Sequence, residues 1–186
     1  TEGITKISAV DFKYAKAMGR SIKLLATSRQ ADGTYSALVA PHLLSPEHPL
    51  YSVNDVFNAV FVHGNVLGGA MFYGSGAGKL PTASAVVADV VDCAKNKGRN
   101  IMMSWSEEKL DLLQIDDVKS RFFVRVSGHA AERQSEIEEL FGKVEIVAVP
   151  SLSEEFAFIT GEITEQEYRE KAEKLDGIQS RIRARI

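Results

Sequence analysis

The chain has few of the residues on which disulfide-rich, metal-binding or membrane proteins depend. Among its 186 residues there is one cysteine, Cys93, together with one tryptophan and five prolines. A single cysteine excludes an internal disulfide and a zinc site built from cysteines, and it fits the reducing cytoplasm, where we expect the protein. The four histidines lack the spacing of metal ligands, so no metal site is predicted. No apolar run approaches the roughly 20 residues of a membrane span, so no membrane contact is expected.

The charge of the chain argues against a polyanionic partner. Its net charge of −3 gives no electrostatic reason to bind nucleic acid or an anionic membrane. Apolar residues make up 45% and charged residues 25%, which is typical of a globular protein with a packed core. The sequence opens on Thr1-Glu2-Gly3, with neither an initiator methionine nor a signal peptide. We therefore expect a cut end, with the N-terminal part of a longer protein missing.

The first half of the chain is expected to contain a short helix and two hairpins. Apolar positions at helical spacing predict a helix over Ser8–Met18, with Gly19 as its stop. Turn residues and strand-like runs predict the hairpins. The first joins 21–30 to 35–44 through the turn 31–34, and the second joins 57–63 to 66–73 through Gly64-Asn65. The stretch that follows the first hairpin is predicted to be a loop, because it is interrupted by Pro41, Pro46 and Pro49.

A glycine-rich segment follows the second hairpin. Gly74-Ser75-Gly76-Ala77-Gly78 leads into a long helix predicted over Pro81–Asn96, and a proline suits the first helical turn, where no amide hydrogen is needed. Cys93 falls among the valines of this helix and is predicted to be a small core residue. Residues 98–116 have the composition of a connector, in which Trp105 is expected to anchor a polar turn.

The second half alternates strands and helices in the order βαββαβ. Thr164 and Glu167 form a capping box, and Gly177 lies beyond the end of that helix. This order in about 70 residues is the ferredoxin-like arrangement. Because both helices cover one face, the other face or an edge needs cover, and we expect a homodimer to supply it. The strands are expected at 122–126, 144–149, 155–160 and 179–186, and the helices at 130–141 and 164–175.

The glycines suggest an anion site, although the spacing alone leaves a plain tight turn equally open. Gly74, Gly76 and Gly78 precede a helix, where free amides and the positive end of the helix dipole favour a pyrophosphate. The spacing is neither the G-x-G-x-x-G dinucleotide fingerprint nor a phosphate-binding Walker loop. Lys79 either contacts a phosphate or is a solvated lysine at the helix start.

The wider sequence resembles the homoserine dehydrogenases. The segment from Phe72 to Asp89 is similar to a segment late in that family, where a Gly-x-Gly-Ala-Gly loop precedes Pro-Thr-Ala-Ser-Ala-Val-Val. Further matches occur in the family's order and at its spacing, at Glu2-Gly3-Ile4, Ile22–Ala26, Val39–Pro41 and Asn58–Gly64. The resemblance covers residues 1–92. It implies hydride transfer between NAD(P) and homoserine or aspartate semialdehyde in threonine and methionine biosynthesis.

The resemblance also implies which parts are present and which are not. Gly76, Ala77 and Gly78 would line the cofactor or substrate cleft, the long helix would pack on the nucleotide-binding domain, and the hairpins would belong to the dimer sheet. The family's dinucleotide fingerprint, catalytic lysine and homoserine-binding acids lie upstream of the match at Glu2. We therefore assign no catalytic residue and expect the isolated chain to bind no NAD(P) and to be inactive. The choice between NAD and NADP stays open.

The second half resembles an ACT domain, a module that binds regulatory amino acids in biosynthetic enzymes. The resemblance rests on element order and on Arg121–Val126. The motif Asp-x-Pro-Gly-Val-Leu, usual in that family, is replaced here by Ser127–Ala131. Two roles therefore stay open for this half: binding of threonine as an allosteric effector, and a purely structural or dimerising role. A free-standing, amino-acid-binding ACT-like protein is the alternative function. It would leave one helix face bare, at Ala83, Val86, Val87 and Val90.

Together these patterns predict an α+β fold. A mixed or antiparallel sheet fragment with a long helix precedes the ferredoxin-like domain. The expected divisions are 1–97 for the catalytic and dimerisation part, 98–116 for a linker and 117–186 for the ACT-like domain. On the last strand, alternating arginines form either an anion-binding patch or a solvated edge: Arg181, Arg183 and Arg185.

Overall fold

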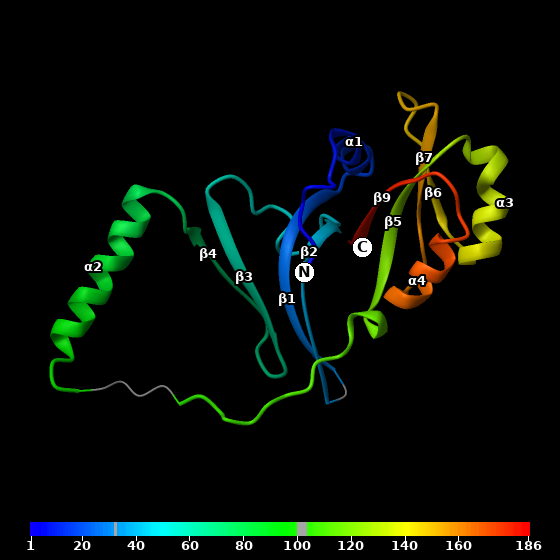
Figure 1. Cartoon of the computed structure of the whole chain (residues 1–186). Coiled ribbons are helices and arrows are strands. Elements are labelled where there is room, and N and C mark those ends of the chain that lie inside the picture. Colours follow the sequence, from blue (N-terminus) through cyan, green and yellow to red (C-terminus); the bar gives the residue numbers. More distant parts are fainter. Residues whose placement is uncertain (32, 100–103) are drawn as a thin grey trace. The chain divides into compact units, whose positions relative to one another are not determined.

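The computed structural model describes residues 1–31, 33–99 and 104–186 and has the expected α+β fold. It divides into two compact units, shown in Figure 1. Unit 1 joins Thr1–Tyr51 to Leu110–Ile186, and unit 2 is Ser52–Lys109. Among the described residues, no helix has both the length and the apolar character needed to cross a membrane.

Unit 1 is built on one mixed sheet whose strands run in the order β1-β2-β9-β5-β7-β6. Four of these strands are the predicted ferredoxin-like set, with the first and third in the centre. All neighbours are antiparallel except β2 and β9, which pair in parallel, and a short strand β8 (Ile163–Thr164) pairs with the start of β5. The bounds are β1 Ser21–Ala31, β2 Thr34–Leu44, β5 Lys119–Ser127, β6 Glu145–Val147, β7 Glu155–Ile159 and β9 Ile178–Arg185.

Helices cover both faces of this sheet. On one face lie α3 (Ala130–Phe141) and α4 (Glu165–Ala172), which Figure 1 shows beside β5–β7. Their core holds nine buried side chains, among them Phe122, Phe156 and Phe158. On the other face α1 (Ala9–Ala17) buries Tyr14 and Ala15 against a second cluster. That cluster contains Leu43, Phe123, Ala157, Ile159, Ile182 and Ala184.

The ends of α1 and α4 follow from their capping residues. Ser8 accepts from the Asp11 amide while Asp11 accepts from the Ser8 amide, which closes a capping box at the start of α1. After the helix, Gly19 has φ +64°, a left-handed conformation that favours glycine. The predicted capping box of Thr164 and Glu167 at the start of α4 is confirmed. Both helices therefore begin where their sequences indicate.

The first hairpin is confirmed, but one proline prediction is wrong. Strands β1 and β2 pair from Ser21↔Leu44 to Ala31↔Thr34. Asp32, in the predicted turn, lies outside the described residues. Pro41 does not end the strand; it lies buried within β2. Pairing with β9 begins only at the next residue, His42, so the amide hydrogen that proline lacks is not needed there.

The two compact units do not follow the divisions expected from the sequence. Residues 1–51 share the sheet and core of the C-terminal half, whereas the expected boundary placed 1–97 together. The reason is the parallel pairing of β2 with β9, a long-range contact that no local pattern reveals. The same chain therefore supplies the cover for which a second copy was expected: β2 lies against the edge of β9, and α1 lies on the open face.

Unit 2 contains a hairpin and a long helix. The hairpin joins β3 (Phe57–Gly64) to β4 (Gly68–Ser75). Its predicted two-residue turn at Gly64-Asn65 is wrong, because Gly64 pairs with Gly68 and three residues form the loop. Gly68 has φ +74°, the left-handed conformation that commonly closes three-residue hairpin loops.

The long helix α2 (Lys79–Lys95) begins two residues before the predicted start, with Pro81 in its first turn. Asn96 is its C-cap residue, and Gly98 follows with φ +79°. None of its residues is buried, so the prediction that Cys93 is a core residue is wrong and its thiol is exposed.

The connector also departs from its prediction. Residues 100–103 lie outside the described part of the chain. The described rest of the stretch 98–116 forms neither an α-helix nor a strand; it contains an isolated bridge between Leu112 and Tyr35 and the start of a short 3-10 helix at Ile115–Asp117. Trp105 is 85% exposed and sits in no turn, so it is not an anchor. A tryptophan in a polar stretch gives no indication by itself of a surface on which it can pack.

Candidate functional site

The glycine loop lies between β4 and α2, as predicted from the sequence. Gly74 and Ser75 end β4, and Gly78 is the N-cap residue of α2. Its carbonyl accepts the first helical hydrogen bond from Thr82, at 3.1 Å. Gly78 has φ +111°, a conformation that side chains rarely adopt. Glycine is therefore required for the backbone at this position.

Gly76 is needed for a different reason, because the loop passes close to Asn58 on β3. A Cβ atom added at Gly76 would lie 2.8 Å from Asn58 Nδ2. The same amide donates to the carbonyl of Val56 at 3.3 Å, so Asn58 is held in place. At Gly74, by contrast, an added Cβ atom would meet nothing within 4 Å. The loop is therefore tightest at Gly76–Gly78, the three positions predicted to line a cleft.

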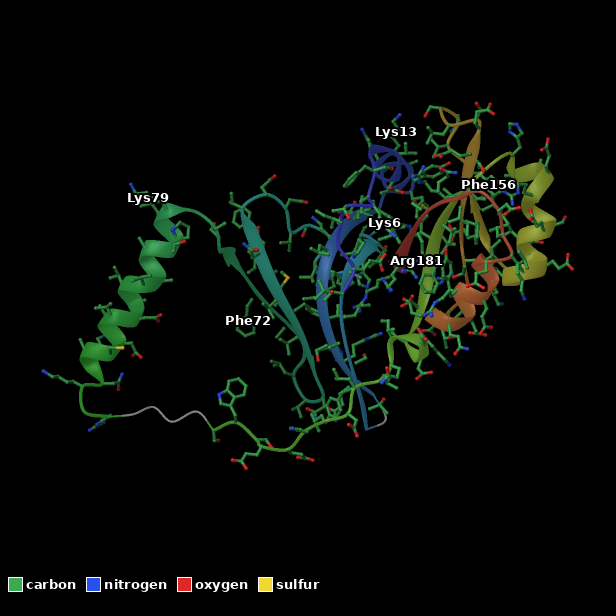
Figure 2. The ribbon with its side chains drawn as sticks, in the orientation of Figure 1. Lys6, Lys13, Phe72, Lys79, Phe156 and Arg181 are labelled. Atoms are coloured by element: carbon green, nitrogen blue, oxygen red, sulfur yellow. The ribbon has the colours of Figure 1, made fainter. Side chains whose placement is uncertain are left out.

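The start of α2 has the chemistry of an anion site. No side chain caps the helix, and its first turn contains no acidic residue. The amides of Lys79 and Leu80 precede the first helical hydrogen bond, and the helix dipole adds positive potential there. Figure 2 shows Lys79 at this first turn. A phosphate fits these features, whereas the loop offers nothing to recognise the rest of a dinucleotide.

Unit 2 exposes large apolar side chains on both of its elements. On the hairpin, Val66 is 94% and Phe72 is 69% exposed, and Figure 2 labels Phe72 on that hairpin. Along α2 the predicted apolar face is exposed, at Ala83, Val86, Val87 and Val90, and Leu80 is exposed as well. Soluble proteins rarely expose so much contiguous apolar surface unless another surface covers it.

A shallow pocket of about 410 Å³ lies beside the turn between β5 and α3. Most of its lining is apolar, including Val149, Leu152 and Phe156. Its one acidic lining residue, Glu155, already accepts two bonds from Arg125 Nη1, at 2.8 and 2.9 Å. Its acidic lining residue is therefore already engaged by an arginine.

A buried polar cluster fixes α1 to the sheet. The guanidinium of Arg125, on β5, donates to Asp11 Oδ1 at 2.7 Å and is paired with Glu155. Ser8 and Ser180 complete the cluster. Burial raises the pKa of Asp11, but hydrogen bonds from Ser180, Ser8 and Arg125 outweigh it, so the pKa lies below 3.8. The cluster thus holds an ionised carboxylate inside unit 1.

Two of the three arginines of β9, Arg181 and Arg183, form a second cluster, and neither sequence-based interpretation of the pattern holds for these two. Arg183 is only 4% exposed and donates to Glu165 at 2.5 Å and to Glu2 at 2.6 Å. Arg181, labelled in Figure 2, pairs with the same two acids and lies over the ring of Tyr168. These side chains are neither a free anion patch nor a solvated edge, because β2 makes β9 an interior strand.

Sequence reasoning missed Asp11 and Arg125, the centre of the first cluster. The Ser8-x-x-Asp11 spacing is a readable capping signal, but nothing local indicates a partner on a strand more than 100 residues away. Within the described ranges, no group of three or more histidine, cysteine or acidic side chains is placed to hold a metal ion.

Comparison with known proteins identifies the first half of the chain. The family model for homoserine dehydrogenase matches residues 1–91. The homoserine dehydrogenase of Corynebacterium glutamicum is 52% identical over 101 residues, which are 52% of this chain and 23% of that protein. The homoserine dehydrogenase of Synechocystis is 41% identical over 136 residues, 67% of this chain and 31% of that protein.

Solved structures extend the similarity to both halves of the fold. A homoserine dehydrogenase from Thiobacillus denitrificans superposes with a TM-score of 0.78 at 27% identity, covering 98% of this chain and 46% of that one. The S. aureus homoserine dehydrogenase at pH 7.0 gives 0.73 at 25% identity, with 99% and 46% covered. This chain spans less than half the length of these proteins. Over residues 1–91 it belongs to the homoserine dehydrogenase family.

Proposed function

We propose that the chain is the C-terminal part of a homoserine dehydrogenase that interconverts L-homoserine and L-aspartate 4-semialdehyde. The observation that carries this proposal is the glycine loop at Gly76–Gly78, which combines the family's sequence with the backbone geometry of a phosphate-binding helix start. In the complete enzyme, a bound NAD(P) supplies the hydride acceptor or donor. The residues of this chain would position its phosphates.

Each exposed surface of unit 2 has a role in this proposal. The amides that follow Gly78 would face a phosphate, with Lys79 as an additional cation. The apolar face of α2 would pack on the nucleotide-binding domain, and the β3–β4 hairpin would join the dimer sheet. Their exposure supports this assignment, because both surfaces are too apolar to remain in water.

The chain by itself is proposed to be inactive and to bind no cofactor. Its sequence contains no dinucleotide fingerprint, and no lysine or acid in it can be assigned a catalytic role by the family resemblance. It covers 46% of the similar solved chains. A helix start and three glycines position a phosphate but do not hold a substrate.

The βαββαβ half is proposed to have a structural role, and not that of a threonine sensor. The pocket at its first turn is mostly apolar, and Arg133 Nη1 closes the turn by donating to the carbonyls of Ser127 and Asp176, at 2.9 and 3.0 Å. Titration calorimetry of the chain with L-threonine is expected to give no binding heat. Saturable binding heat would contradict a purely structural role and would support threonine as an allosteric effector.

A chimera tests the proposed function directly. Residues 1–91 would replace the matching segment of the Corynebacterium glutamicum enzyme, and NADPH oxidation with aspartate semialdehyde would be measured. We expect activity in the chimera and none in this chain alone. The Gly76→Ala variant of the chimera should raise the KM for NADPH at least tenfold, because the new methyl group displaces Asn58 or the loop.

Gly74→Ala is the matched control, since its Cβ atom would meet nothing within 4 Å. Equal KM values for the two variants would show that Gly76 does not position the cofactor. An inactive but folded chimera would contradict the proposed function of residues 1–91. Turnover by the isolated chain would contradict its proposed inactivity.

A further inference from the structure

Asn58 is a polar residue in the strand that precedes the glycine loop in space. It lies on β3 directly opposite Gly74 of β4, and asparagine and glycine are both disfavoured in strands. Its side chain is exposed and belongs to neither core cluster of the described residues. The stability of the hairpin therefore does not account for an asparagine at this position.

The side chain of Asn58 leans towards the glycine loop. Opposite residues of an antiparallel pair share a face, so the side chain has Gly74 directly across and Gly76 on the diagonal. A Cβ atom added at Gly74 would meet no described atom within 4 Å. One added at Gly76 would meet three atoms of Asn58: Nδ2 at 2.8 Å, Cγ at 3.3 Å and Cβ at 3.6 Å. The carboxamide therefore occupies the space over Gly76.

The carboxamide also lies where the pairing of the hairpin ends. The outermost pair is Phe57↔Ser75, so Val56 and Gly76 are the first residues beyond it. Asn58 Nδ2 donates to the carbonyl of Val56 at 3.3 Å and lies against Gly76. One amide group thus binds the chain that enters β3 and contacts the backbone of the loop that leaves β4.

The position of Gly76 matters for the start of α2. Gly78, the N-cap residue of the helix, comes only two residues later, and the amides assigned to a phosphate follow it. A displacement of Gly76 is therefore transmitted to these donors. Binding groups that are misplaced by about 1 Å can cost an enzyme roughly a hundredfold in rate.

We propose that Asn58 is a positioning residue that sets the distance between the glycine loop and the cofactor phosphates. Its carboxamide is anchored on the carbonyl of Val56, packs against Gly76 and keeps the amides beyond Gly78 in place. This role rests on the proposed function of the loop. It adds that Asn58 and Gly76 act as one unit, because the asparagine fills the space that any larger residue at 76 would need.

A double-mutant cycle in the chimera tests this coupling. Asn58→Ala removes Nδ2 and Cγ, so the methyl group of Gly76→Ala then meets only a Cβ atom, at 3.6 Å. Asn58→Ala alone should raise the KM for NADPH about fivefold, and Gly76→Ala alone at least about tenfold, with kcat changed less than about twofold. The double variant should stay within about twofold of Asn58→Ala, whereas independent effects would multiply to about fiftyfold. A multiplied effect would overturn the proposal.

A charge variant and a matched control separate positioning from a general loss of structure. Asn58→Asp keeps the shape of the side chain but should raise the KM for NADPH more than Asn58→Ala does, because a carboxylate repels both the Val56 carbonyl and a phosphate. The control is Asn54→Ala, because the Asn54 amide also donates to a carbonyl two residues earlier, that of Ser52 at 3.2 Å, yet is not among the atoms nearest to Gly76. An equal rise in the control, or unchanged KM in both Asn58 variants, would refute the role.

NMR spectroscopy of the full chain tests the contact without turnover. The Asn58 Nδ2 protons should show a nuclear Overhauser effect to the α-protons of Gly76, and Asn58→Ala should shift the amide signals of 76–78. Absence of both effects would overturn the proposal. An inactive but folded chimera would contradict the proposed function and this role with it, whereas an active chimera whose variants do not couple would overturn this role alone.

Discussion

Removal of one carboxylate, in Asp11→Ala, tests the claim that α1 is locked to the sheet by a buried ionic cluster. Asp11 is fully buried and accepts from the amide and hydroxyl of Ser8, from Ser180 and from Arg125. The variant removes all four acceptor contacts but leaves the helix sequence otherwise intact. It therefore separates the cluster from helix propensity.

The magnitude follows from two losses. Loss of the capping box costs about 1 kcal/mol. Removing one partner of a buried ion pair costs about 3–5 kcal/mol, because the other charge stays buried. Glu155 remains bonded to the Arg125 guanidinium at 2.8 and 2.9 Å and offsets part of that penalty. We therefore expect the free energy of unfolding to fall by about 3 kcal/mol at pH 7.

Urea unfolding followed by circular dichroism measures this change, with Glu162→Ala as an exposed control expected to lose under about 0.5 kcal/mol. The folded pKa of Asp11 lies below 3.8, so its contribution is complete above pH 3.8 and is lost as pH falls through the folded pKa. The difference between Asp11→Ala and the parent should shrink accordingly. A loss under about 1 kcal/mol at pH 7, or one independent of pH, would refute the lock.

Three other perturbations have defined outcomes. Gly177→Ala should lower the free energy of unfolding by more than about 2 kcal/mol, and Gly19→Ala by about 1 kcal/mol. Both glycines have positive φ, but only at Gly177 would the new Cβ atom lie 2.2 Å from a hydroxyl oxygen, that of Ser127. Equal losses of the two variants in urea unfolding would contradict this reasoning. Burial lowers the pKa of His42 from 6.5 to about 4. The contribution of the neutral His42 to the free energy of unfolding is complete above pH 6.5 and is lost as the pH falls towards 4, a loss of at most about 3 kcal/mol. His42→Gln should therefore make the free energy of unfolding less dependent on pH between 6.5 and 4. Val87→Lys should reduce fluorescence of an apolar dye bound to the chain, without changing the unfolding of unit 1.

Local signals in the sequence carried much of the fold. The capping box at Thr164, the stop at Gly19 and the alternation of the second half each depend on residues close together in the chain, and each is confirmed. The glycine loop between β4 and α2 was predictable for the same reason. The family model and the curated relatives agree with the resemblance read from residues 1–92.

Predictions were wrong where the structure of a segment depends on a residue far away in the sequence, or where no described residue of this chain packs on the segment. The parallel pairing of β2 with β9 joins residues 42–44 to residues 183–185, and no pattern in either strand indicates the other. Cys93 was expected in a core because α2 is apolar, but no described residue of this chain covers that face. An apolar pattern indicates that a surface needs cover and does not show where the cover comes from.

The parallel pairing of β2 with β9 also sets an order of folding. The ion pair between Glu2 and Arg183 joins residues 181 positions apart, so the last strand must leave the ribosome before the sheet is complete. Until then the β1–β2 hairpin has an open edge, and Tyr14 lacks most of its apolar neighbours. Such non-local closure folds slowly, and the unpaired strand edge is prone to aggregation until it is complete. Damage to β9 would therefore prevent the β1–β2 hairpin from completing its pairing, although the hairpin is synthesised earlier than β9.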